Sequence, residues 1–258
     1  MVDYEVQGRV ALITLNRPGA RNAVNGAVAT EMEAAIDRME DDPDVWVGVL
    51  RANTEGQDRP VFSAGADLKA INAGEGGSLN TARGGFAGYA YRERRKPVIV
   101  AVDGLATAGG CEIVLASDLV VATTRSAFGL AEVKRNLVAG AGGLFRLPRA
   151  VGRAAAMEAI LTGEPIPAER AFQLGLVSRL VEPGQAEAEA MALAAKICEA
   201  APLAVWESRA IVLAADYEDD DTLKAMTNKA MGTMMRSDDL KEGLAAFIEK
   251  RAPQWQGR

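Results

Sequence analysis

Glu112 has the clearest potential for chemistry, because it follows two glycines and precedes an apolar run in TAGGCEIVLAS, residues 107–117. Charged side chains are rarely buried without a partner. A glycine pair at the start of a helix lets the backbone approach a ligand with free N–H groups. On the residues alone, the simpler interpretation is a glutamate in the first turn of a helix, where the helix dipole favours a negative charge. Both interpretations stay open at this point.

A second turn of similar kind lies in FSAGADLKAI, residues 62–71, where small residues again lead into a helix. Each turn offers a backbone N–H group, and two converging N–H groups would form an oxyanion hole. The spacing of the two turns in the sequence does not decide whether their N–H groups converge. Glu132, between FGLA and VKR, is by itself typical of a surface residue.

The chain contains no histidine. This absence excludes a Ser-His-Asp triad, a Cys-His pair and a histidine-ligated metal. Cys111 and Cys198 form neither a disulfide framework nor a spaced metal set, and we expect both to be small core residues. Ser63 is not part of a G-x-S-x-G motif. Acid–base chemistry must therefore come from carboxylates, lysine, tyrosine or cysteine, and we expect no metal site.

Nucleotide and nucleic-acid binding find little support in the sequence. A G-x-G-x-x-G motif is absent, and the GAGG at residues 140–143 lacks the third glycine and a long preceding strand. The formal net charge is −6, so neither a nucleic acid nor an anionic membrane is an expected partner. The basic cluster YRERRKP, residues 91–97, is most often a solvated face, and a docking point for a phosphorylated ligand is the alternative.

Alternating strand and helix patterns predict an α/β fold. Apolar runs indicate strands at residues 10–15, 45–52, 97–102 and 118–123, and helical spacing indicates a helix at residues 28–39. The runs are nearly continuous, which is typical of strands that are covered on both faces.

From residue 186 onward the sequence is helical. Segments with helical composition lie at residues 186–200, 203–217 and 237–251. We therefore predict an α/β body of residues 1–190 followed by an all-helical region of residues 191–258.

The last of these segments carries one apolar stripe. Ser237 or an adjacent aspartate would cap this helix. The stripe could pack on the body or form a subunit interface, and the residues alone favour neither. Its members are Leu240, Leu244, Phe247 and Ile248.

Four stretches carry a resemblance to a known family, in the order and spacing of that family: FSAGADLK, AGGCE, FGLAEVKRNLVAGAGGLFRLPR and DLKEGLAAFIEKRAPQW. The chain resembles the crotonase, or enoyl-CoA hydratase/isomerase, superfamily over nearly its whole length. The resemblance implies a ββα superhelical spiral followed by a C-terminal helical region that builds trimers. It therefore implies a homotrimer or a dimer of trimers.

The resemblance also implies an activity, the reversible addition of water across the 2-trans double bond of an acyl-CoA thioester. Matching by motif gives the oxyanion-hole N–H groups to Ala66 and Gly109. Glu112 would orient and activate the water, and Glu132 would exchange the C2 proton. No cofactor is implied, because coenzyme A is part of the substrate.

Positions that match the family's coenzyme A contacts lie mainly in the turn of residues 62–71. The glycine-rich segment at residues 73–88 is expected to be an irregular loop that sets acyl chain-length preference. Ala131 and Ala139 replace prolines found in many hydratases, which puts the substrate range in doubt more than the reaction class. The matching positions are Ala64, Asp67, Leu68, Lys69, Arg21 and Lys250.

Three alternatives remain beside a hydratase. A carnitinyl-CoA dehydratase-like enzyme shares the glutamate pair, whereas an enoyl-CoA δ-isomerase commonly keeps one carboxylate. A non-enzymatic CoA-binding protein would have no chemical need for the pair. With no signal peptide and no bilayer-spanning apolar run indicated, we expect a cytoplasmic location.

Overall fold

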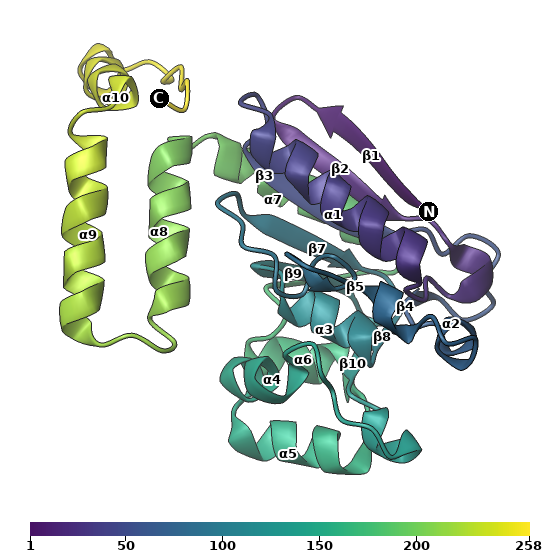
Figure 1. Ribbon diagram of the computed structural model, residues 1–258. Helices are drawn as coiled ribbons and strands as arrows, with labels where there is room; N and C mark the ends of the chain where they lie inside the picture. The colour runs from purple at the N-terminus through teal and green to yellow at the C-terminus, as the bar shows by residue number, and fades with distance from the viewer.

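The computed structural model describes residues 1–258, and a six-stranded sheet forms the centre of the body (Figure 1). The strands follow the order β1-β2-β3-β7-β9-β12, with β1 and β2 antiparallel and the other neighbours parallel. The strands are β1 (Val2–Gln7), β2 (Val10–Leu15), β3 (Val47–Ala52), β7 (Val98–Val102), β9 (Leu119–Thr123) and β12 (Arg179–Val181).

A second, four-stranded sheet has the order β11-β10-β8-β4. The chain passes from β3 to β4, from β7 to β8 and from β9 to β10, so it moves repeatedly from the first sheet to the second. A helical segment follows each pair, which confirms the expected ββα spiral. The strands are β4 (Val61–Ser63), β8 (Leu105–Thr107), β10 (Ala127–Gly129) and β11 (Ile166–Pro167).

Helices and short turns complete the body. Leu12, Val49 and Ile99 lie in one apolar cluster with α7, and the alternate residues of the same strands lie in a second cluster on the other face. This two-sided burial explains the continuous apolar runs. The elements are α1 (Gly26–Asp41), α2 (Leu68–Asn72), α3 (Gly109–Leu115), α4 (Gly143–Val151), α5 (Arg153–Thr162), α6 (Ala168–Leu174), α7 (Ala186–Cys198), η1 (Pro18–Ala20), η2 (Gly76–Leu79), η3 (Glu132–Arg135), β5 (Asn80–Thr81) and β6 (Gly85–Phe86).

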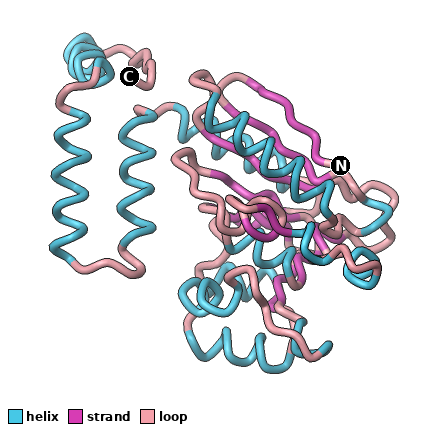
Figure 2. The backbone as a smooth tube through the Cα atoms, in the orientation of Figure 1, coloured by secondary structure: helices cyan, strands magenta, loops and turns pink.

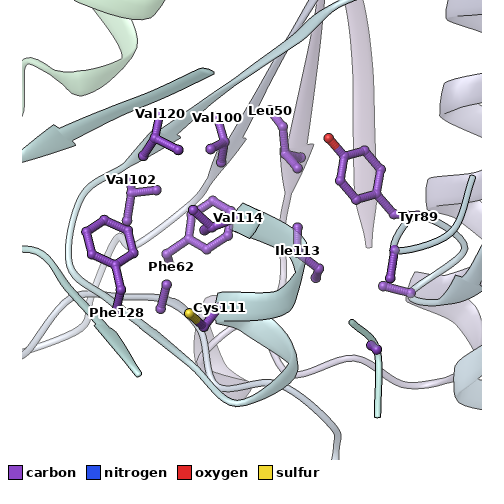
Figure 3. Close-up of a cluster of buried hydrophobic side chains, with 14 of the residues drawn as sticks. Leu50, Phe62, Tyr89, Val100, Val102, Cys111, Ile113, Val114, Val120 and Phe128 are labelled. Carbon is purple, nitrogen blue, oxygen red and sulfur yellow. The ribbon is translucent and has the colours of Figure 1, made fainter. Parts of the chain in front are cut away.

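Helix α3 is anchored deep in the larger cluster. Cys111, Ile113 and Val114 point into a group of buried side chains that includes Phe62 and Phe128 (Figure 3). Of the two cysteines, Cys111 is buried as expected, whereas Cys198 is half-buried. Because the apolar side of α3 is fixed in the core, the direction of its remaining side chains is fixed as well.

The expected strands and the helix at residues 28–39 are present with small shifts of their ends. Strand β1 was not predicted, because its residues alternate toward solvent at the sheet edge. The segment at residues 73–88 is less irregular than expected. It contains η2 and the small β5–β6 hairpin, and it buries Leu79 and Phe86.

The last three helices form an arm that stands apart from the body (Figures 1 and 2). They are α8 (Pro202–Ala214), α9 (Asp220–Met234), which was not predicted, and α10 (Asp238–Glu249). Ser237 caps α10 as expected, since its Oγ accepts the Leu240 N–H at 3.2 Å. The apolar stripe of α10 does not pack on the body, because Phe247 is 84% exposed and Ile248 is 77% exposed.

Helix α7 packs on the six-stranded sheet, so a division of the chain at residue 190 falls within this helix. The arm is joined to the body by Trp206, whose indole N–H donates to the Trp46 carbonyl at 3.1 Å. None of the helices combines the length and apolar character needed to cross a membrane.

Candidate active site

The two glycine turns recognised in the sequence lie in direct backbone contact. Gly65 has φ +81°, and a Cβ atom at this position would lie 2.7 Å from the Gly109 nitrogen. Only glycine allows both this backbone conformation and this approach. The neighbouring N–H groups of Ala66 and Gly109 donate no hydrogen bond within the protein. Two free main-chain donors are therefore held next to each other.

Ala108 is a feature of this turn that the sequence did not reveal. It adopts φ 51° and ψ −130°, a backbone conformation that is strained for a residue with a side chain. Its N–H donates to the Gly129 carbonyl at 2.8 Å, and this contact ties the turn to β10. The strained residue directly precedes Gly109, so it fixes the orientation of the peptide that carries the Gly109 N–H.

Glu112 extends from α3 into the interior and is 3% exposed. Its Oε1 accepts the N–H groups of Ala141 at 2.7 Å and Gly143 at 2.9 Å. Burial raises the pKa of Glu112, while these two N–H groups and the charge of Arg146 act in the opposite direction. The GAGG segment, which has no nucleotide motif, thus has a different role: its backbone holds this carboxylate.

Glu132 begins η3 and is also partly buried. Its Oε2 is enclosed and has no hydrogen-bond partner. Burial raises the pKa of Glu132 to about 6, and the negative charge of Glu112 contributes to this increase. The two carboxyl groups are therefore close enough to interact, although twenty residues separate them in the chain. A surface role does not explain an enclosed carboxylate without a partner.

The residues assigned to coenzyme A divide into two groups. The Ala64 N–H donates to the Arg21 carbonyl at 3.0 Å, so Arg21 lies beside the turn. Leu68 and Lys69 are exposed at the start of α2, next to Ala66.

The other two positions have different surroundings. Asp67 caps α2 through the Lys69 N–H and pairs with Arg17 at 2.6 Å. The hydrogen bond from Arg17 lowers the pKa of Asp67, so this carboxylate is already engaged. Lys250 directly follows α10 as its C-cap, and within one chain this helix lies far from α3 (Figure 1).

The acidic groups of the site do not form a metal centre. No group of three or more histidine, cysteine, aspartate or glutamate side chains is placed to hold a metal ion. The arrangement instead offers two interacting carboxyl groups beside two free backbone donors. Such a site can stabilise a developing oxyanion and move protons close to it.

A family model described as Enoyl-CoA hydratase/isomerase matches residues 5–258. The chain belongs to this family. It is 37% identical to the short-chain-enoyl-CoA hydratase of Clostridium acetobutylicum, with 97% of the chain and 95% of that protein covered. It is 36% identical to the carnitinyl-CoA dehydratase of Salmonella typhi, with coverage of 97% and 96%. The crystal structure of enoyl-CoA hydratase EchA1 from Mycobacterium marinum is 45% identical and superposes with a TM-score of 0.93, covering 100% of this chain and 99% of that chain.

The packing of Gly143 predicts the effect of one added methyl group. A Cβ atom there would lie 2.8 Å from Leu130 Cδ1 and 3.1 Å from Glu112 Cγ. Gly143→Ala should therefore displace the Glu112 carboxylate and lower kcat on an enoyl-CoA by roughly a hundredfold. Steady-state kinetics would measure the loss. Gly140→Ala is the matched control, because a Cβ atom there meets nothing within 4 Å. Equal activity of the two variants would contradict this placement of Glu112.

Proposed function

We propose that this protein is an enoyl-CoA hydratase, which adds water reversibly across the 2-trans double bond of an acyl-CoA thioester. The observation that carries this proposal is the pair of interacting carboxyl groups of Glu112 and Glu132. The free N–H groups of Ala66 and Gly109 lie in two adjacent turns, and Gly109 begins α3, the helix that carries Glu112. Membership of the enoyl-CoA hydratase/isomerase family supports the same reaction class.

The free N–H groups of Ala66 and Gly109 would bind the thioester oxygen. When water adds at C3, negative charge moves through C2 to this oxygen, and an enolate forms. Donors that are already oriented stabilise that charge without further reorganisation. Loss of one such donor typically costs about 2.7–4 kcal/mol of barrier. This chemistry needs no separate cofactor, because coenzyme A enters with the substrate.

The two glutamates have different roles because their surroundings differ. Glu112 Oε1 is occupied by two N–H groups, while its Oε2 accepts no hydrogen bond from the protein and would orient the water. Glu132 has an unpartnered oxygen and would deliver the proton to C2. The water proton passes to Glu112 as the proton of Glu132 passes to C2, so the pair holds one proton before and after hydration.

The coenzyme A part of the substrate would bind along the turn of residues 62–71. Ala64 and Leu68 would contact it through the backbone and an exposed apolar side chain, and Arg21 and Lys69 would offer cations to its phosphates. Asp67 would hold α2 in place through Arg17. Lys250 could reach a coenzyme A only on another copy of the chain, since α10 lies away from α3 (Figure 1).

Hydration of crotonyl-CoA tests the proposal directly. Loss of the ultraviolet absorbance of the conjugated thioester should follow addition of the protein. Glu132→Gln should reduce turnover by at least about a hundredfold, because the amide cannot supply the C2 proton. Glu158→Gln, at an exposed position of α5, should behave as wild type.

Three results would change the assignment. Full turnover by Glu132→Gln would exclude its role. Conversion of a 3-enoyl-CoA without hydration would indicate an isomerase, and activity confined to carnitinyl-CoA would indicate the dehydratase. Binding of acyl-CoA with no turnover of any substrate would indicate a non-enzymatic protein.

The pKa of about 6 at Glu132 predicts how the activity depends on pH. Above this value both carboxyl groups are ionised and no proton is available for C2. kcat/KM should therefore fall by up to about tenfold per pH unit as the pH rises beyond about 6. Hydration and dehydration should follow the same curve, because the overall reaction neither takes up nor releases a proton. A flat profile from about pH 5 to about pH 8 would contradict this assignment.

We propose that the helical region 191–258 builds a homotrimer or a dimer of trimers through the arm of α8 to α10. Its exposed apolar side chains, above all Phe247 and Ile248, support an interface. Light scattering should give three or six times 27.2 kDa, and Phe247→Asp should lower this mass. Lys241→Asp, an exposed change on the same helix, should leave it unchanged. A wild-type monomer at micromolar concentration would refute the proposal.

A further inference from the structure

We propose that Arg146 and Tyr91 are positioning residues that clamp the loop at residues 140–143 so that its N–H groups hold Glu112. This inference rests on the proposed function of Glu112 in hydration. It assigns a role to Tyr91, which belongs to the basic cluster at residues 91–97 and takes no part in the reaction itself.

Arg146 holds the middle of the loop. The only hydrogen bond of its side chain runs from Nη1 to the Ala141 carbonyl at 3.2 Å. The guanidinium also packs against Gly142, where an added Cβ atom would lie 2.7 Å from Nη1. Gly142 has φ +101°, a conformation that side chains rarely adopt. Glycine is thus required both by the turn and by the arginine that lies on it.

Tyr91 holds the start of the same loop. Its hydroxyl donates to the Gly140 carbonyl at 3.0 Å. The guanidinium carbon of Arg146 lies 5.4 Å from the centre of the Tyr91 ring, within the range of a cation–π interaction. The two side chains therefore form one unit, although one comes from the segment before β7 and the other from α4.

The loop is consequently fixed from two sides. The carbonyl groups of residues 140 and 141 accept from Tyr91 and Arg146, and the N–H groups of Ala141 and Gly143 donate to Glu112. The peptides of a four-residue loop are coupled through its backbone, so rotation on one side would move the donors on the other. Orientation of a catalytic group by partners behind it is a common requirement of acid–base sites.

The charge of Arg146 adds to this geometric role. From α4 it lowers the pKa of Glu112, whereas the charge of Glu112 in turn raises the pKa of Glu132 on η3. Around the guanidinium itself lie Tyr91 and the buried groups Tyr89 and Arg94.

Arg146 therefore favours a negative charge on Glu112 and leaves the shared proton on Glu132. Hydration requires this distribution, because Glu112 has to receive the water proton.

Titration of Glu112 in the ligand-free protein tests the clamp without reference to activity. The probe is the carboxyl ¹³C signal of labelled glutamate, assigned by its loss in Glu112→Gln. Arg146→Met should raise the pKa of Glu112, because it removes a positive charge and the hydrogen bond that orients the loop. Arg146→Lys keeps the charge and one donor and should restore most of the wild-type value.

A control and an activity profile complete the experiment. Arg149→Met removes an exposed arginine from the next turn of α4, 5.5 Å from the Phe145 ring, and should change nothing. In kcat/KM, Arg146→Met should move the acid limb to higher pH, and Tyr91→Phe should lower kcat with little change in KM.

Two outcomes would overturn the clamp. A Glu112 titration that is the same in wild type and Arg146→Met would exclude it. A uniform loss of activity at every pH, with the acid limb unmoved, would assign Arg146 a structural role only. If the wild type hydrates no enoyl-CoA, the proposed function fails, and the titration still decides the clamp.

Discussion

The burial of two neighbouring carboxyl groups is the constraint on which the rest of the structure depends. Removal of a carboxylate from water is unfavourable unless hydrogen bonds or opposite charges compensate for it. Glu112 obtains two backbone N–H groups and a nearby arginine, whereas the enclosed Oε2 of Glu132 has no hydrogen-bond partner. In the proposed mechanism one proton stays on the pair, and the raised pKa of Glu132 keeps it there up to a pH of about 6.

The spiral provides the rigid surroundings that this pair needs. Helix α3 is fixed by Cys111, Ile113 and Val114 in the core (Figure 3), so Glu112 cannot turn toward solvent without disturbing packed side chains. Successive ββα turns place the ends of β4 and β8 side by side, and there Gly65 meets Gly109. The strain at Ala108 persists because β4 and β10, the two neighbours of β8 in the second sheet, hold the turn on either side.

Much of the fold followed from local patterns, whereas much of the site did not. Apolar runs and helical spacing located four strands and most helices, because these elements bury a regular face. Strand β1 and helix α9 were not predicted because neither presents such a face to the core. The strands of the second sheet, each two or three residues long, and helices α4 to α6 were not predicted either. The partners of Glu112 lie 29 and 31 residues away, in a segment whose glycines match no nucleotide-binding motif. No local sequence pattern connects Glu112 with this segment, because only the spiral fold brings them together. The resemblance to crotonases named both glutamates, but it gave no reason why their environments differ.

The central claim is that the N–H groups of Ala66 and Gly109 receive a thioester oxygen beside the glutamate pair. The ultraviolet absorption maximum of bound cinnamoyl-CoA, a conjugated enoyl thioester, tests it most directly when the protein carries Glu132→Gln to prevent turnover. Hydrogen bonds to the carbonyl oxygen pull electron density along the conjugated system, so the account predicts a clear shift of the maximum to longer wavelength on binding. A saturating complex whose maximum equals that of the free thioester would contradict it.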